Sequence, residues 1–446
     1  MTLKICFLSP EYTGFGGGIG TFYRCLAPAL VRAGVEVTVI EGSCFANSAM
    51  PSRTSVDGVV IQKLEAARVN AWLDKMNHLS ALPSLSRHLA AAWASWEQAQ
   101  ENGPFDIIEA TDFGLLMVPP LLAGNTPVIA QMHGSSGQIQ SKDPAIGEEI
   151  AGALSLAIES EAARLVASCQ TYSAANQDYW NRASGSHAVE LLPPAWIGSG
   201  SQSQPATIRP VISVFGRIQM WKGPKILSEA LTLLPDCPVV HWYGRDLANS
   251  ETGIGTTKDQ LLKMYPAIWQ GRVVTHDPVP PEAVQTLQAS SLVNLIPSTW
   301  DVFNFTVIEA MASGRPVVCS DRAGAAELIE DGVTGFVYDG TSAQALAAAL
   351  RRALALSPEE SLKMGAAAQA QIASLLDPDL IAKQRIDAYI RAIDNKQIEA
   401  SAPDWLLQVA KPRQHSPEKY YFLNNLPLRP LVNHIGRRVV SKLKGK

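Results

Sequence analysis

The stretch Pro297-Ser-Thr-Trp-Asp301-Val-Phe-Asn-Phe-Thr-Val-Ile-Glu309-Ala-Met-Ala-Ser-Gly-Arg-Pro-Val-Val318 is the most informative part of this sequence. Thr306 and Glu309 have the Thr-x-x-Glu spacing of a capping box, which predicts the start of a helix. Gly314 is expected to end that helix, and the apolar run after it predicts a strand. Asp301 therefore belongs to the loop before the helix, and Glu309 to its first turns.

A helix start suits a phosphate, because it presents free backbone N–H groups and a partial positive charge. Two carboxylates beside it could bind the hydroxyls of a sugar or a ribose. Alternatively, Glu309 only caps its helix and Asp301 is an ordinary loop acid.

Composition narrows the class of protein. The chain has 446 residues, 47% of them hydrophobic, which is enough for two domains with full cores. A formal net charge of -4 argues against a dedicated nucleic-acid binder. The six cysteines form no Cys-x-x-Cys pair, and no His, Cys, Asp and Glu set has metal spacing. We therefore expect no metal and no cofactor.

The N-terminal apolar run is too short for a signal peptide, and no stretch reaches the roughly 18–20 apolar residues of a membrane span. We expect a cytoplasmic protein, either soluble or peripheral on the inner face of the membrane.

Short apolar runs alternate with helical patterns, which predicts an α/β chain with parallel sheets. The expected strands are 5–8, 35–40, 107–109, 128–131, 211–215, 239–243, 273–275 and 292–296. The expected helices are 21–33, 151–167 and 224–234. A Pro, Gly, Ser and Gln-rich stretch at 198–205 predicts a linker, so two doubly wound Rossmann-like domains should face each other across a cleft.

A glycine cluster, Gly14-Phe-Gly-Gly17-Gly18-Ile-Gly20, follows the first strand. Glycine lets backbone N–H groups approach a ligand closely, so Gly17 and Gly18 are candidate binding residues. The spacing matches neither an NAD fingerprint nor a P-loop. The alternative is a flexible surface turn.

A second cluster, Gly216-Arg217-Ile-Gln-Met-Trp-Lys222-Gly223-Pro224, precedes a helix. Arg217 and Lys222, together with the helix start, can neutralise a diphosphate without a metal. The alternative is that both are solvated surface charges. His133, at the end of the strand at 128–132, could bond a substrate hydroxyl, although a lone histidine is more often structural.

The C-terminal segment from Glu399 to Lys446 carries nine Lys or Arg against three Asp or Glu. Apolar residues from Leu431 to Leu443 repeat at helical spacing, which is typical of a helix on an anionic membrane surface. The alternative is a tail whose apolar stripe packs on the protein itself.

Taken together, these motifs resemble GT-B glycosyltransferases of the large retaining family 4. The resemblance covers residues 3–395 and depends on the order of four parts: the Gly17-Gly18 loop, His133-Gly134, the Gly216-Arg217 and Lys222-Gly223 pair, and the stretch at 297–318. A fifth match is Ala323-Gly-Ala-Ala-Glu327-Leu-Ile-Glu-Asp-Gly-Val-Thr-Gly335. Departures are Asp301 for the usual Glu, Asn304 for Gly, and Leu192-Pro-Pro-Ala-Trp196 before the linker.

The resemblance implies a domain plan. It comprises an acceptor domain at 1–195, a nucleotide-sugar donor domain at 206–375, a helix at 376–398 returning to the first domain, and a basic extension at 399–446.

It also implies residue roles. Arg217 and Lys222 would hold the donor diphosphate, with Gly216 beside them. Glu309 would bind the ribose, Asp301 the donor sugar, and His133 would face the transferred sugar. Gly17 and Gly18 would approach the diphosphate and acceptor, and Asn304 and the amides of Phe305 and Thr306 would add contacts to the donor.

The expected function is therefore retaining, metal-independent transfer of a hexose from a UDP- or GDP-sugar to a hydroxyl of a glycan or lipid. Two alternatives stay open: a sugar-nucleotide epimerase or hydrolase with the same fold, and a non-catalytic nucleotide-sugar binding protein.

Overall fold

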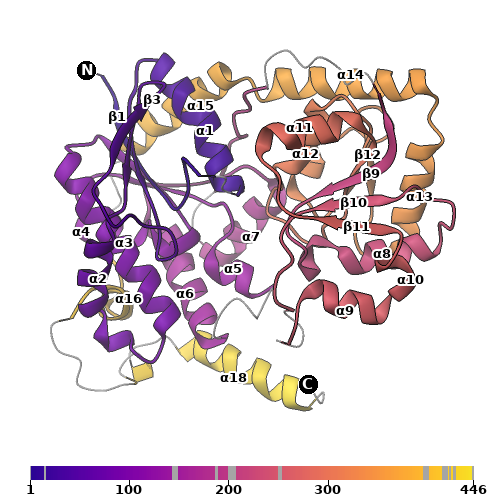
Figure 1. Cartoon of the computed structure of the whole chain (residues 1–446). Helices are drawn as coiled ribbons and strands as arrows, with labels where there is room; N and C mark the ends of the chain where they lie inside the picture. Colours follow the sequence, from indigo (N-terminus) through magenta and orange to yellow (C-terminus); the bar gives the residue numbers. More distant parts are fainter. Residues whose placement is uncertain are drawn as a thin grey trace. The chain divides into compact units, whose positions relative to one another are not determined.

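The computed structural model describes residues 2–14, 17–142, 149–185, 189–198, 207–249, 254–394, 401–413, 420, 423–424 and 428–443. The chain divides into two compact units, Met1–Pro194 with Pro378–Lys446, and Ala195–Asp377 (Figure 1). Each contains a predominantly parallel sheet with helices, so the predicted fold class is confirmed. The predicted linker at 198–205 lies, except for residue 198, outside the described residues.

The N-terminal unit has an eight-stranded sheet in the order β3-β4-β2-β1-β5-β6-β7-β8. Neighbouring strands run parallel except β3 and β4, which Asp57 and Gly58 join as a hairpin with positive φ at both positions. The strands are β1 Lys4–Ser9, β2 Glu36–Glu41, β3 Arg53–Val56, β4 Val59–Lys63, β5 Ile107–Thr111, β6 Val128–Gln131, β7 Ser168–Thr171 and β8 Glu190–Leu191.

The helices of this unit come from both ends of the chain. They are α1 Gly18–Arg32, α2 Ala66–Asp74, α3 Pro83–Asn102, α4 Val118–Ala123, α5 Ser136–Gln140, α6 Glu149–Leu165, α7 Ala174–Ser184, α15 Pro378–Asp394, α16 Asp404–Ala410 and α18 Leu428–Leu443. In the part of the chain that the structure describes, no helix is both long and apolar enough to span a bilayer.

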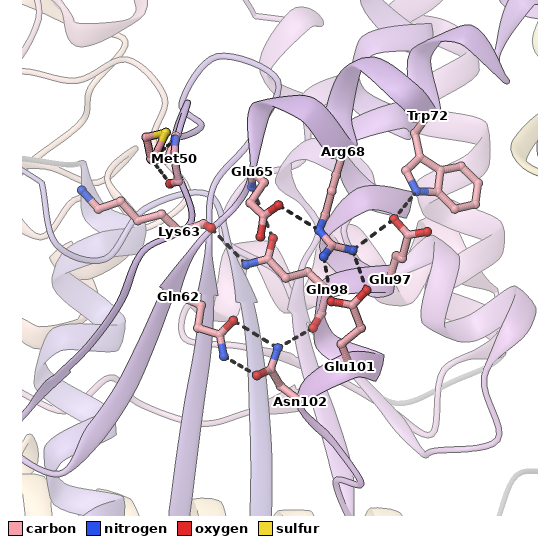
Figure 2. Close-up of polar contacts among 11 residues, drawn as sticks. Met50, Gln62, Lys63, Glu65, Arg68, Trp72, Glu97, Gln98, Glu101 and Asn102 are labelled. Carbon is pink, nitrogen blue, oxygen red and sulfur yellow. Dashed lines mark hydrogen bonds and ion pairs between the residues drawn. The ribbon is translucent and has the colours of Figure 1, made fainter.

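The side chain of Arg68 on α2 forms ion pairs with α3 (Figure 2). The two terminal nitrogens of Arg68 bond the two carboxylate oxygens of Glu101, both at 2.7 Å, and the guanidinium also lies near Glu65 and Glu97. Glu97 in turn accepts from the indole N–H of Trp72 at 3.0 Å. A bidentate guanidinium pair constrains orientation as well as distance, so this network adds a directional contact between the two helices.

Helices α15 and α16 complete the N-terminal unit. The fully buried Arg385 of α15 donates to the side-chain carbonyls of Gln131 and Gln170, both at 2.6 Å, and the Tyr389 hydroxyl bonds Glu109 at 2.6 Å. The last residue of α16, Ala410, accepts from the Trp93 indole at 2.8 Å. Residues more than 200 positions apart therefore share one core.

The C-terminal unit has a six-stranded parallel sheet in the order β11-β10-β9-β12-β13-β14. Its strands are β9 Arg209–Phe215, β10 Val240–Tyr243, β11 Val273–His276, β12 Ser291–Ile296, β13 Val317–Ser320 and β14 Phe336–Tyr338. Its helices are α8 Pro224–Thr232, α9 Thr257–Met264, α10 Pro266–Trp269, α11 Pro281–Ser290, α12 Thr306–Ala312, α13 Ala343–Leu354 and α14 Pro358–Leu375.

The two faces of this sheet are built differently. One face packs apolar side chains of β9, β10 and β12 against α8 and α13. On the other face, Ser213 and Asn294 bond each other at 2.5 Å, and the Asn294 amide also reaches the Gln288 carbonyl of α11 and the hydroxyl of Ser313 after α12. Helices therefore cover both faces, as in a doubly wound fold.

In each unit the chain order reverses between two central strands. These are β1 and β5 in the N-terminal unit, and β9 and β12 in the C-terminal unit. Loops leaving the carboxyl ends of such strands diverge, and ligands of doubly wound sheets bind where they do. The first glycine cluster follows β1, the second follows β9, and the stretch at 297–306 follows β12, so the topology brings these three motifs to the two switch points.

Candidate active site

In the C-terminal unit, the loops after β9 and β12 touch through a glycine. Gly223 has φ of +83°, and an added Cβ would lie 1.7 Å from the carbonyl oxygen of Pro297. No other residue type fits there without moving the backbone. This contact holds the loop that carries Arg217 and Lys222 against the loop that carries Asp301.

Lys222 and Asp301 form an ion pair at this junction. The side chains are only 16% and 12% exposed, so solvent screens the pair far less than a surface pair. The Lys222 ammonium also lies 4.4 Å from the centre of the Trp221 ring. Arg217 is exposed, with its guanidinium carbon 5.9 Å from the same ring. The two predicted cations therefore lie beside one indole, and Lys222 contacts the predicted acid Asp301.

Asn304 takes a backbone conformation that explains the residue at this position. Its φ is +74°, in the left-handed region where glycine is common and asparagine is tolerated. Its side-chain amide donates to Ser298 at 3.3 Å, and its side-chain carbonyl accepts from the backbone N–H of Thr306 at 3.2 Å. The asparagine therefore keeps the turn that a glycine would allow and also orders the loop.

The predicted capping box is wrong. Helix α12 begins at Thr306, so the N-cap residue is Phe305. A phenylalanine side chain cannot accept a hydrogen bond from the first turn, and the helix has no side-chain cap. The physical reason is that Asn304 turns the chain in the left-handed conformation. Its side-chain carbonyl then accepts the Thr306 backbone N–H, which the Glu309 carboxylate would accept in a capping box. Glu309 does lie in the first turn of α12 and is half-buried.

The loop after β13, which leads into the fifth motif, is hydrogen-bonded to the Asp301 loop. Asp301 donates its backbone N–H to the Arg322 carbonyl at 2.9 Å and accepts from Gly324 at 3.2 Å. Phe303 accepts from Ala325 at 2.7 Å. The fifth motif thus braces the Asp301 loop, and its Glu327 lies in a short 3-10 helix, Gly324–Leu328, rather than in an α-helix.

In the N-terminal unit, His133 follows β6 and is held by a buried carboxylate. Asp112, directly after β5, accepts the backbone N–H groups of Phe113, His133 and Gly134 at 2.8, 2.9 and 3.1 Å. Burial raises the pKa of Asp112 to about 7, although these hydrogen bonds oppose that shift. Asp112 therefore connects the loops after β5 and β6.

The imidazole of His133 is buried among aromatic rings of α1 and of the residue directly after β7. Its Nδ1 lies 2.8 Å from the Tyr172 hydroxyl, and its ring meets Phe22 edge to face at 4.9 Å. Burial, and secondarily the charge of Arg385, hold the pKa of His133 well below its usual value, so the ring is neutral at physiological pH. Among the described residues, its buried Nε2 has no hydrogen-bond partner. A neutral imidazole with one unsatisfied nitrogen can bond a ligand hydroxyl without carrying charge.

The first glycine cluster was expected to precede the first helix, but its last two glycines, Gly18 and Gly20, belong to α1. Gly17 is the N-cap residue, and Gly18 opens the helix three residues earlier than predicted. The Gly17 N–H donates to the Glu11 carboxylate at 2.6 Å. Glu41, at the end of β2, accepts the N–H groups of Tyr12 and Thr13 at 2.9 and 2.7 Å. Phe15 and Gly16 of this cluster lie outside the described residues.

Sequence reasoning missed four residues that shape these sites: Glu11, Asp112, Tyr172 and Trp221. Asp112 offered a signal, because an acid directly after a buried apolar strand is expected at the carboxyl edge of a parallel sheet. Tyr172 contacts His133, 39 positions away, and the contacts of Glu11 and Trp221 depend on how their loops fold, so the three residue types carry no comparable signal.

Comparison with known proteins identifies the family and the fold. The family Glycosyl transferases group 1 matches residues 201–371, and the Glycosyl transferase 4-like domain matches residues 17–195. The D-inositol 3-phosphate glycosyltransferase of Pseudarthrobacter chlorophenolicus is 27% identical over 385 residues, 80% of this chain and 86% of that protein. The Streptomyces griseus enzyme of the same name is 33% identical over 199 residues, 42% of this chain but only 40% of its own length.

Two solved structures share the fold at low identity. Sucrose-phosphate synthase from Thermosynechococcus elongatus superposes with a TM-score of 0.67 at 18% identity, covering 88% of this chain and 99% of that one. Anabaena HepE, solved with UDP and glucose, gives 0.60 at 19% identity, covering 86% and 99%. The fold is thus that of the GT-B glycosyltransferases. The chain belongs to the glycosyl transferases group 1, and it is an enzyme that transfers a sugar from a nucleotide sugar.

Proposed function

We propose that this glycosyltransferase moves a hexose from a UDP- or GDP-sugar to a hydroxyl of a glycan or lipid acceptor, with retention at the anomeric carbon and without a metal ion. The observation that carries the proposal is the Lys222–Asp301 pair at the switch point of the C-terminal sheet, beside the start of α12.

Lys222 and Arg217 would hold the donor diphosphate. An ammonium and a guanidinium in place before the reaction stabilise the charge that develops on a departing nucleoside diphosphate, because they need little reorganisation. Asp301 keeps the Lys222 ammonium at the loop junction, and Trp221 lies beneath both cations. The Thr306 amide already bonds Asn304, so it would have to exchange that partner to bind a phosphate.

The remaining predicted residues would take the other roles in this proposal. Glu309, in the first turn of α12, would accept hydrogen bonds from the ribose hydroxyls. Asp301 would bond a donor-sugar hydroxyl with the oxygen that Lys222 leaves available. Neutral His133 would bond a hydroxyl of the transferred sugar through Nε2, and Gly17 and Gly18 would let the backbone approach the substrate.

The test compares Lys222→Ala and Arg217→Ala with the matched control Lys225→Ala, an exposed lysine three positions further on in α8. Removing a positioned electrostatic group typically costs about 2–4 kcal/mol of transition-state stabilisation, a rate loss of about 10²–10³. We expect that loss in kcat/KM for the first two variants and near-normal transfer for Lys225→Ala. A thermal-shift screen of UDP-, GDP- and ADP-sugars first identifies the donor. Near-normal turnover of folded Lys222→Ala would refute the assignment.

Two controls separate the alternatives. Rapid conversion of the donor without an acceptor would favour an epimerase or hydrolase. Donor binding without turnover across an acceptor panel, with activity appearing in Asp301→Glu, would favour a non-catalytic binding protein.

A further inference from the structure

Helix α18 exposes a continuous apolar stripe. Leu428, Val432, Ile435, Val439 and Leu443 are 75%, 62%, 53%, 50% and 81% exposed. Their spacings of three and four residues place them on one side of the helix. The prediction that this segment forms an apolar-striped helix holds. The alternative is a stripe packed on the protein itself. Of the stripe predicted from the sequence, Leu431 is half-buried, whereas Val432, Ile435, Val439, Val440 and Leu443 are at least half exposed.

The helix is nevertheless attached to the protein. It packs against α6 in the N-terminal unit, and Leu431, adjacent to the stripe, is half-buried. At 16 residues, α18 is about 24 Å long. One side of the helix therefore joins the unit, and the stripe faces away from its core. Apolar stripes of this length are uncommon on the surface of a soluble monomer and indicate an interaction surface.

The positive charge of the C-terminal segment indicates an anionic partner for the helix. Residues 428–446 contain six Lys or Arg and no Asp or Glu: Arg429, Arg437, Arg438, Lys442, Lys444 and Lys446. Pairing two such helices from two copies of the chain would bring like charges together, which disfavours self-association. An anionic bilayer complements both properties, because its headgroups attract the cations and its acyl boundary accepts the apolar side chains.

We propose that α18 is a membrane-docking helix that lies in the interface of an anionic phospholipid bilayer, with its apolar stripe inserted and the basic residues among the headgroups. The alternation of apolar and polar positions suits a helix lying in the membrane plane. This inference is independent of the donor and acceptor of the transfer reaction, since it depends only on the surface of α18.

The experiment is co-flotation of the full-length protein with vesicles. One set contains phosphatidylcholine and phosphatidylglycerol in equal parts, and the other phosphatidylcholine alone. The variants are Ile435→Asp in the stripe, Arg437→Glu with Arg438→Glu for charge, and Ile390→Asp as the matched control. Ile390 lies on α15 of the same unit and is 47% exposed, close to the 53% of Ile435.

We expect the wild type and Ile390→Asp to float with the anionic vesicles only, and less at high salt. Each lost cation should weaken binding about fivefold, so the double charge variant should bind at least about 25-fold more weakly, and Ile435→Asp at least tenfold. Unfolding transitions equal to the wild type show that the variants are folded. Absence of flotation with anionic vesicles at low salt, equal flotation of Ile435→Asp, or a dimer lost in Ile435→Asp would overturn the proposal.

Discussion

Replacing Gly223 with alanine tests whether the two site loops depend on the contact between Gly223 and Pro297. The added Cβ would lie 1.7 Å from the Pro297 oxygen, a distance that no pair of such atoms can maintain. The loop that carries Lys222 must then move away from the loop that carries Asp301. We expect the variant to lose both stability and donor binding.

The size of the effect follows from two separable costs. A non-glycine residue in the left-handed region costs about 1–2 kcal/mol. Forcing an extra carbon into a packed contact costs about 1–3 kcal/mol more. The free energy of unfolding of the C-terminal unit should therefore fall by about 2–5 kcal/mol. For a domain of this size, that corresponds to a midpoint about 4–20 °C lower.

Gly34→Ala provides the matched control. Gly34 has φ of +89°, close to the +83° of Gly223, but no atom lies within 4 Å of an added Cβ. It should therefore cost only the conformational part, about 1–2 kcal/mol. Calorimetry gives the midpoints, hydrogen exchange assigns the loss to peptides around Lys222, and titration with the nucleotide diphosphate measures binding. If Gly223→Ala destabilises the protein no more than Gly34→Ala and binds the nucleotide normally, the reasoning is wrong.

Two further predictions concern titration. Because burial and Arg385 lower the pKa of His133, kcat/KM of the wild type should show no inflection from this residue near pH 6.5, while His133→Phe should lose about 10²-fold at every pH. An acidic limb near pH 6.5 that disappears in His133→Phe would contradict this. Burial raises the pKa of Glu159 from 4.5 to about 8, so the folded protein holds a proton that the unfolded chain releases, and stability falls as pH rises through that window. In Glu159→Gln this contribution, at most about 1.4 kcal/mol per pH unit, should vanish, and parallel melting-temperature curves for wild type and variant from about pH 5 to 8 would count against it.

Local patterns predicted most of the secondary structure because they report local physics. The strand at 128–131 matches β6, and the strand at 211–215 lies within β9, since short apolar runs bounded by glycine or proline have few other ways to be buried. The helix at 224–234 begins at Pro224 as predicted, because proline suits the first helical position. The same local reasoning located the start of α12 at Thr306 but assigned it the wrong cap, since a Thr-x-x-Glu spacing carries no information about the φ of Asn304.

Residue types and their spacing were enough to predict the α/β class, the order of the motifs, and the glycines and cations of the candidate site. Those features depend on residue type and spacing, which the chain carries along its length. The folded chain was needed to show that Lys222 pairs with Asp301, 79 positions away, and that Asp112 orders the His133 loop. The physical reason is that strand order brings distant loops to one edge of a sheet, where burial then raises the pKa of Asp112 and lowers that of His133.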